Sequence, residues 1–179
     1  MRIGLGFDSH RLIAGRPLYL GGIGIPHPKG LLGHSDGDAV IHALIDACLG
    51  AAGEGDIGQL FPDTDPATAG VRSTILLQDV VGRLRKKGFR LGHADVVVAA
   101  ETPKLGPHFE AMKDALCPLL GLRRDGLGLK AKTHEGLGDI GHGRAIACWA
   151  IVSLVKIPPR KKAPRKSRDE PSARHSPVA

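Results

Sequence analysis

Three side chains that bind metal ions occur in the first quarter of the chain at a spacing that suits one ion. Asp8 and His10 are two residues apart at the end of an expected strand over residues 1–8, so both side chains point to the same face. His42 lies on an expected helix. One carboxylate and two imidazoles suit zinc and leave a fourth position open, as in catalytic zinc sites. The pattern predicts a zinc centre, and an ion pair between His42 and Asp38 within the helix is the alternative.

A second polar cluster precedes the same helix. Ser35 and Asp36 are residue types that cap helix N-termini, where an acidic side chain also interacts well with the helix dipole. Capping does not require His34, which is a candidate hydrogen-bond donor to a phosphate group. The cluster therefore predicts a capped helix with a phosphate contact at its start.

Two carboxylates lie one helical turn on either side of His42. Asp38 and Asp46 fall four residues before and after it, so a carboxylate is placed to orient the second nitrogen of a zinc-bound His42. A solvated charge on the helix surface is the alternative for Asp46.

A glycine-rich segment near residue 140 matches a nucleotide-binding pattern in part. Gly136, Gly138 and Gly141 spell G-x-G-x-x-G, but the acidic residue expected about 20 positions later is missing from the segment Lys156–Lys162. The segment is therefore not interpreted as a dinucleotide site. The sequence also contains no Walker loop.

The elements that position these residues alternate between strand and helix patterns. Apolar stripes predict one helix that starts at Ser35 or Asp36 and ends at Gly50 or Gly53, a second from Ser73 to Gly88, and a third over 107–120. Long strands with three amphipathic helices and no internal repeat favour an α+β fold. We expect a two-layer sandwich in which a mixed β-sheet carries the three main helices on one face. Strands are expected over residues 1–8, 17–26, 89–100, 127–133 and 144–157.

Composition separates a folded body from a basic tail. The 179 residues carry a net charge of +7, and seven basic against two acidic residues after position 157 leave only +2 for residues 1–157. We expect one domain over 1–157 and a disordered tail over 158–179, which is rich in proline and charge. Aromatic residues make up only 3% of the chain, so nucleic-acid binding is not expected.

The apolar segments are short and the cysteines scattered. No apolar run approaches the ~18–20 residues that cross a bilayer, and residues 1–8 do not have the pattern of a signal peptide. We therefore expect a cytoplasmic protein without a membrane partner. Cys48, Cys117 and Cys148 lie far apart among apolar neighbours, which predicts buried free thiols.

Four stretches of the sequence together carry a family resemblance. They are GLGFDSHRL (4–12), GHSDGDAVIHALIDACLGAAGEGDIGQLFPDTDP (33–66), AETPKLGPH (100–108) and KAKTHEGLG (130–138). In order and spacing they resemble the 2-C-methyl-D-erythritol 2,4-cyclodiphosphate synthase family from residue 1 to about 157. Because Met1 directly precedes the first stretch, the resemblance is to the stand-alone enzyme and not to the form fused to a cytidylyltransferase.

The resemblance implies a lyase of the non-mevalonate isoprenoid route. Its substrate would be 4-diphosphocytidyl-2-C-methyl-D-erythritol 2-phosphate, whose 2-phosphate attacks the β-phosphorus, releases CMP and closes a cyclic diphosphate. The family forms homotrimers with active sites between neighbouring subunits. A zinc-dependent phosphohydrolase, in which water is the nucleophile, is the alternative function.

Matching positions imply a role for each motif residue. Asp8, His10 and His42 would hold Zn²⁺, and Glu135 would hold Mg²⁺ or Mn²⁺ at the substrate diphosphate. His34 and Thr133 would stabilise the transition state. Lys132 departs from the family, in which threonine is frequent, and its charge suits a diphosphate. The implied substrate contacts are Ser35, Asp56, Ile57, Gly58, Phe61, Pro62, Asp63, Thr64, Asp65, Ala100, Pro103, Lys104, Leu105, Gly106, Lys132 and His134.

Overall fold

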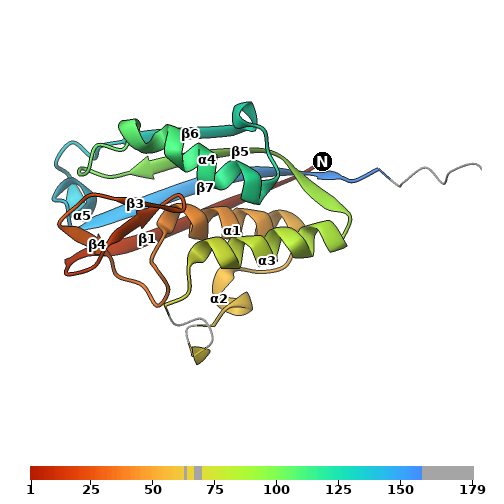
Figure 1. Cartoon of the computed structure of the whole chain (residues 1–179), viewed down its shortest axis with the longest axis horizontal. Helices are drawn as coiled ribbons and strands as arrows, with labels where there is room; N and C mark the ends of the chain where they lie inside the picture. Colours follow the sequence, from red (N-terminus) through yellow and green to blue (C-terminus); the bar gives the residue numbers. More distant parts are fainter. Residues whose placement is uncertain (63, 67–69, 159–179) are drawn as a thin grey trace, which may run out of the picture.

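A five-stranded sheet and three long helices are the main elements of the fold (Figure 1). The computed structural model describes residues 1–62, 64–66 and 70–158. Asp63 and nearly all of the expected tail lie outside the described residues. In chain order the elements are β1 (Arg2–Ala14), β2 (Leu18–Leu20), β3 (Ile23–Ile25), β4 (Lys29–Leu31), α1 (Ala39–Ala52), α2 (Ile57–Leu60), α3 (Ser73–Lys86), β5 (Phe89–Ala99), η2 (Gly106–His108), α4 (Phe109–Leu120), η3 (Arg124–Gly126), β6 (Leu127–Lys132), α5 (Gly138–Gly141) and β7 (Ala145–Lys156).

The sheet has the strand order β4-β1-β7-β5-β6 and is mixed, as expected. β5 and β6 run parallel, while the other neighbours are antiparallel. The register of β1 on β7 runs from Arg2 opposite Leu154 to Arg11 opposite Ala145. A separate hairpin of β2 and β3 lies beside the sheet. The α+β class predicted from the sequence is therefore confirmed.

The core lies between one face of the sheet and the helices. Figure 1 shows α1, α3 and α4 over the same side of the sheet, and α1 contacts both β1 and β7. Along β7 the residues that face α1, such as Cys148 and Val152, are fully buried. Alternate residues such as Trp149 and Ile151 keep 37% and 50% of their surface exposed. This period of two means that the opposite face carries apolar side chains that the described residues of the chain leave partly exposed.

The α1 helix begins and ends at identifiable residues. Its N-cap is Asp38, whose carboxylate accepts from the backbone N–H of Ile41. The prediction of Ser35 or Asp36 as the cap was therefore wrong by two or three residues. Gly53 closes the helix in the left-handed conformation at φ 75°, while Gly50 stays inside it. Because eleven of its residues are buried, α1 is the central helix of the core.

β1 and α1 approach each other unusually closely. A Cβ atom at Gly4 would lie 2.0 Å from the Ala47 carbonyl oxygen, and one at Gly6 would lie 2.0 Å from the Ala43 carbonyl oxygen. Only residues without a side chain allow this contact, because both neighbours are backbone atoms. The two glycines therefore set the separation between the strand that carries Asp8 and the helix that carries His42.

The remaining differences from the expected elements concern short segments. β1 continues six residues beyond the expected end, because residues 9–11 still pair with β7 and residues 12–14 pair with β4. The short elements β4, α2, α5 and the two 3₁₀ helices were not predicted. All three cysteines are buried and free, as expected. No helix in the described part of the chain is long and apolar enough to cross a membrane.

Candidate active site

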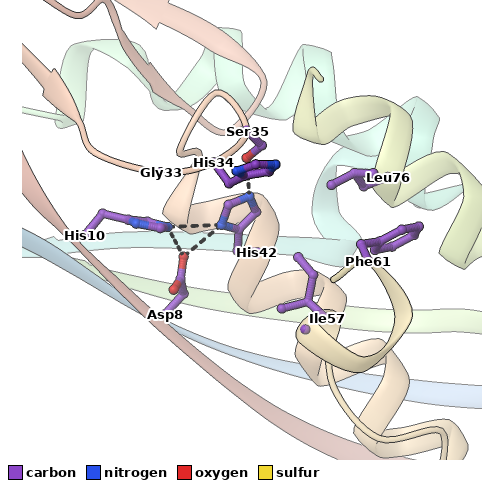
Figure 2. Close-up of a pocket in the computed structure, with 10 residues that line it drawn as sticks. Asp8, His10, Gly33, His34, Ser35, His42, Ile57, Phe61 and Leu76 are labelled. Atoms are coloured by element: carbon purple, nitrogen blue, oxygen red, sulfur yellow. Dashed lines mark hydrogen bonds and ion pairs between the residues drawn. The ribbon is translucent and has the colours of Figure 1, made fainter. Parts of the chain in front are cut away.

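The three predicted metal ligands meet at one point. Asp8 Oδ2 lies 2.8 Å from His10 Nε2 and 3.0 Å from His42 Nδ1, and the two imidazole nitrogens are 3.1 Å apart (Figure 2). Adjacent positions on one face of β1 bring Asp8 and His10 together, and α1 adds His42 from the opposite side. Within the described residues this is the one trio of His, Cys, Asp or Glu side chains whose ligand atoms all lie within 4.8 Å.

The geometry of the trio suits a tetrahedral ion. Zinc bonds of about 2.0–2.1 Å place neighbouring ligand atoms about 3.3 Å apart, so a small expansion of the 2.8–3.1 Å triangle accommodates the ion. One carboxylate and two imidazoles are donors typical of a catalytic zinc site. The three atoms also line a cavity, which leaves room for a fourth ligand.

The carboxylate and the imidazoles of this cluster shift one another's pKa values. Burial alone would raise the pKa of the Asp8 carboxyl, but hydrogen bonds and charge from His10 and His42 outweigh it and hold that pKa well below its usual value. Burial would lower the pKa of His10, yet the hydrogen bond and charge of Asp8 raise it. The cluster therefore contains an ionised carboxylate, as a zinc ligand must be.

The far nitrogen of His42 is held by hydroxyl groups and not by the carboxylates expected from the helix spacing. His42 Nε2 lies 2.8 Å from Ser73 Oγ and 3.1 Å from Ser35 Oγ. Asp38 instead accepts the backbone N–H groups of Gly21, Gly22 and Ile41. Its complete burial raises its pKa despite these three donors.

Asp46 is also engaged elsewhere. Its carboxylate accepts the backbone N–H of Ile57 at 2.8 Å and so ties α2 to α1. Partial burial raises the pKa of Asp46. The interpretation of Asp38 and Asp46 as partners of His42 was therefore wrong, and so was the solvated alternative for Asp46.

A cavity of about 370 Å³ opens beside the trio. Figure 2 shows the imidazoles of His10, His34 and His42 on one side, and Ile57, Phe61 and Leu76 on the other. A compound with an anionic group and a small apolar body would match these two sides. Gly33 and Leu76 were not predicted from the sequence. The predicted residues that line this cavity are Asp8, His10, His34, Ser35, His42, Ile57, Gly58 and Phe61.

A second cavity of about 360 Å³ lies at the end of β5 and β6. It has no lining residue in common with the first cavity. Two lysines, Lys104 and Lys132, against one carboxylate, Glu101, in its lining favour an anionic ligand. Glu101, Pro107, Phe109 and Ala131 complete the wall and were not predicted. The predicted residues that line the second cavity are Ala100, Pro103, Lys104, Leu105, Gly106, Lys132 and Thr133.

Glu135 lies just beyond the second cavity with a backbone conformation that is rare for its residue type. Its φ of 50° is in the left-handed region, which costs a non-glycine residue about 1–2 kcal/mol. The Thr133 hydroxyl donates to Glu135 Oε1 at 2.5 Å. The turn therefore presents a carboxylate next to a cavity lined by two lysines.

The remaining predicted contacts line neither cavity. Asp56 caps α2 by accepting the backbone N–H of Gln59, and this contact lowers its pKa. His134 donates its backbone N–H to Glu101 at 3.4 Å. Pro62, Thr64 and Asp65 follow α2 in the chain, next to Phe61 of the first cavity.

Comparison with known proteins gives a consistent result. Residues 1–155 match the model of the YgbB family. The 2-C-methyl-D-erythritol 2,4-cyclodiphosphate synthase of Gloeobacter violaceus is 53% identical over 86% of this chain and 94% of its own length. The synthase of Serratia proteamaculans is 50% identical over 87% of this chain and 99% of its own length.

A solved structure is similar over the same region. It is a 2C-methyl-D-erythritol-2,4-cyclodiphosphate synthase in a form bound to CDP, with 49% identity and a TM-score of 0.80. The match covers 86% of this chain and all of that one.

Proposed function

Since this chain belongs to the YgbB family and acts as a 2-C-methyl-D-erythritol 2,4-cyclodiphosphate synthase, we propose that its reaction takes place between the two cavities, each contributed by a different copy of the chain. The substrate is 4-diphosphocytidyl-2-C-methyl-D-erythritol 2-phosphate, and the products are the cyclic diphosphate and CMP. The trio of Asp8, His10 and His42 is the observation that carries the proposal for the metal centre.

The chemical difficulty is the approach of one phosphate to another. The attacking 2-phosphate and the β-phosphate both carry negative charge, and a flexible chain must close into a ring. Fixing both ends of the substrate reduces the entropic barrier, and placing positive charge around the phosphates reduces their repulsion. Each cavity supplies part of this arrangement.

The first cavity holds the methylerythritol part and the metal. Asp8, His10 and His42 would hold Zn²⁺, and the ion would polarise the attacked phosphate. His34, exposed at the rim, donates to phosphate oxygen. Ile57 and Phe61 exclude water from the apolar side of the substrate and keep its carbon skeleton in place.

The second cavity holds the cytidine diphosphate part. Lys104 and Lys132 offset the charge of the phosphates. The Thr133 hydroxyl, once released from Glu135, donates to the phosphoryl group that is being transferred. Glu135 is the ligand for Mg²⁺ or Mn²⁺, because its exposed carboxylate is a hard oxygen donor beside the same cavity. The CDP in the similar solved structure supports a cytidine nucleotide as the ligand.

We infer that the two cavities combine in a homotrimer. The sheet face opposite α1 exposes a row of large apolar side chains, including Leu5 at 65% and Ile151 at 50% exposure, which a soluble chain normally covers. Phe7 and Trp149 pack together on this face with ring centroids 5.1 Å apart. Contact between these faces in three copies would bring the first cavity of one copy next to the second cavity of its neighbour.

The proposal keeps the domain boundary and location expected from the sequence. Residues 1–157 form the catalytic domain, in agreement with a family match that ends at residue 155. The basic segment after residue 157 takes no part in the proposed reaction. The cytoplasm is the expected compartment.

Mixing two inactive variants tests the shared site directly. His42→Ala damages the first cavity and Lys104→Glu damages the second. In trimers that assemble at random from equal amounts of both, about one site in four pairs an intact first cavity with an intact second cavity. We expect about a quarter of wild-type activity after co-refolding. If both cavities of one site come from the same chain, mixing restores no activity, and this result would contradict the proposal.

A further inference from the structure

The hydrogen bonds behind His42 form a continuous buried chain. His42 Nε2 lies 2.8 Å from Ser73 Oγ, and this hydroxyl lies 2.5 Å from Asp36 Oδ1. Ser73 is fully buried, while Asp36 and His42 each expose only 8% of their surface. The contacts join α1, α3 and the loop before α1, so they cross 31 and 37 positions of sequence.

The direction of each hydrogen bond follows from the metal site. When His42 coordinates through Nδ1, a neutral imidazole carries its proton on Nε2. Nε2–H therefore donates to Ser73 Oγ, and the Ser73 hydroxyl donates to the Asp36 carboxylate. In the opposite tautomer the proton would occupy Nδ1, the nitrogen that must be free for the ion. The chain of hydrogen bonds thus selects the tautomer that binds metal.

The acceptor at the end of this chain is itself held firmly. Asp36 Oδ2 accepts the backbone N–H of Ser73 at 3.1 Å and Arg72 Nε at 3.0 Å. The carboxylate thus lies at the N-terminus of α3, where the helix dipole favours a negative charge. The N-cap position of α3 is Arg72, and the Ser73 hydroxyl contacts His42, Asp36 and Ser35.

Ser35 offers a natural comparison. Its hydroxyl lies 3.1 Å from the same nitrogen of His42, and it accepts the backbone N–H of Gly37 at 3.3 Å. Ser35 Oγ also lies 3.4 Å from Ser73 Oγ, so it reaches the Asp36 carboxylate only through Ser73 and makes no direct contact with it. Ser73 lies both nearer to His42 and in contact with a carboxylate.

We propose that Ser73 is a positioning residue which, with Asp36 behind it, orients His42 and fixes its tautomer for zinc binding. This inference rests on the proposed zinc centre and goes beyond its three ligands. An outer partner of this kind typically contributes about 10- to 100-fold to metal affinity. The Ser73 hydroxyl therefore makes the zinc site tight without touching the ion.

The test measures zinc affinity rather than turnover. Zinc is removed from the wild type and from Ser73→Ala, Ser35→Ala and Val80→Ala, and its dissociation constant is measured by competition with a chromogenic chelator. Val80 is fully buried on the same helix as Ser73 and lies about two turns further along it. Its truncation to alanine therefore controls for a general loosening of α3. The Co²⁺ absorption spectrum of each protein reports the ligand geometry, and the unfolding temperature of each zinc-free protein is recorded.

We expect Ser73→Ala to bind zinc about 10- to 100-fold more weakly and to show a changed Co²⁺ spectrum. Val80→Ala should keep affinity and spectrum close to wild type. Ser35→Ala should lose clearly less affinity than Ser73→Ala, because its hydroxyl is farther from His42 Nε2 and makes no direct contact with the Asp36 carboxylate. The proposal is overturned if Ser73→Ala binds as tightly as wild type, or if either control loses as much affinity. A wild-type protein that binds no zinc would instead refute the metal centre itself, and with it the positioning role of Ser73.

Discussion

A single methyl group added at Gly6 should disable the metal site without touching any ligand. Gly6 lies on β1 two residues before Asp8, at the point where the strand meets α1. A Cβ atom there would lie 2.0 Å from the Ala43 carbonyl oxygen and 2.5 Å from the Ala47 nitrogen. Neither contact can be relieved by a side-chain rotation, because both atoms belong to the helix backbone.

The size of the effect follows from these distances. Since Cβ atoms essentially never approach other atoms within 3.0 Å, β1 and α1 must separate by about 1 Å in Gly6→Ala. Asp8 and His10 move with the strand while His42 stays with the helix, and zinc sites tolerate distance errors of only about 0.2 Å. We expect zinc affinity to fall by at least about 100-fold. Overpacking should also lower the free energy of unfolding by about 1–3 kcal/mol.

Gly50→Ala provides the matched control. Gly50 lies within α1 and also faces β1, but a Cβ atom there would lie 3.9 Å from the nearest atom, the Leu5 carbonyl oxygen. This substitution should leave zinc affinity unchanged and stabilise the helix by about 0.5–1 kcal/mol. Chelator competition and thermal unfolding measure both effects. Wild-type zinc affinity in Gly6→Ala would refute the argument that the strand–helix separation sets the site.

Three further perturbations probe the site itself. His42→Ala should abolish zinc binding and turnover, while circular dichroism shows a retained fold because the cap and apolar stripe of α1 remain. Lys132→Ala should raise KM about 10-fold with a smaller change in kcat, because the lysine contacts the diphosphate. Steady-state kinetics measure both constants, and an unchanged KM would show that Lys132 does not contact the substrate. Zinc affinity should fall as the pH drops below the raised pKa of His10, because a proton then competes with the ion, and should level off above that pKa. Titrations between about pH 5.5 and 8.5 that show no such dependence would contradict the assignment of His10 as a ligand.

Local patterns in the sequence predicted most of the long elements. The apolar stripe of α1 and the glycines after α1 and α3 placed both helices, because period and end signals are local properties. The three-residue strand β4 and the last six residues of β1 were missed. Their pairing depends on a contact between distant segments, which no local pattern records.

The metal ligands could be predicted from the sequence, but the hydrogen-bond partners of His42 could not. The period of two on β1 correctly placed Asp8 and His10 together. The chemistry of the three donors suggested His42 as the third ligand, and the family resemblance implied the same set. Helix spacing suggested Asp38 and Asp46 as partners of His42, yet backbone N–H groups outside the helix bind both carboxylates. Ser73 was predicted only as the start of a helix, because its contact with His42 spans 31 positions and no local sequence pattern records it.

Phosphorus NMR of the purified protein with its cytidylyl substrate and Mg²⁺, before and after zinc is removed with a chelator, tests the central claim most directly. The account predicts that CMP and the cyclic diphosphate appear together, that both are lost when zinc is removed, and that both return when zinc is restored. A linear phosphate product, or cyclisation that continues at full rate without zinc at Asp8, His10 and His42, would contradict it.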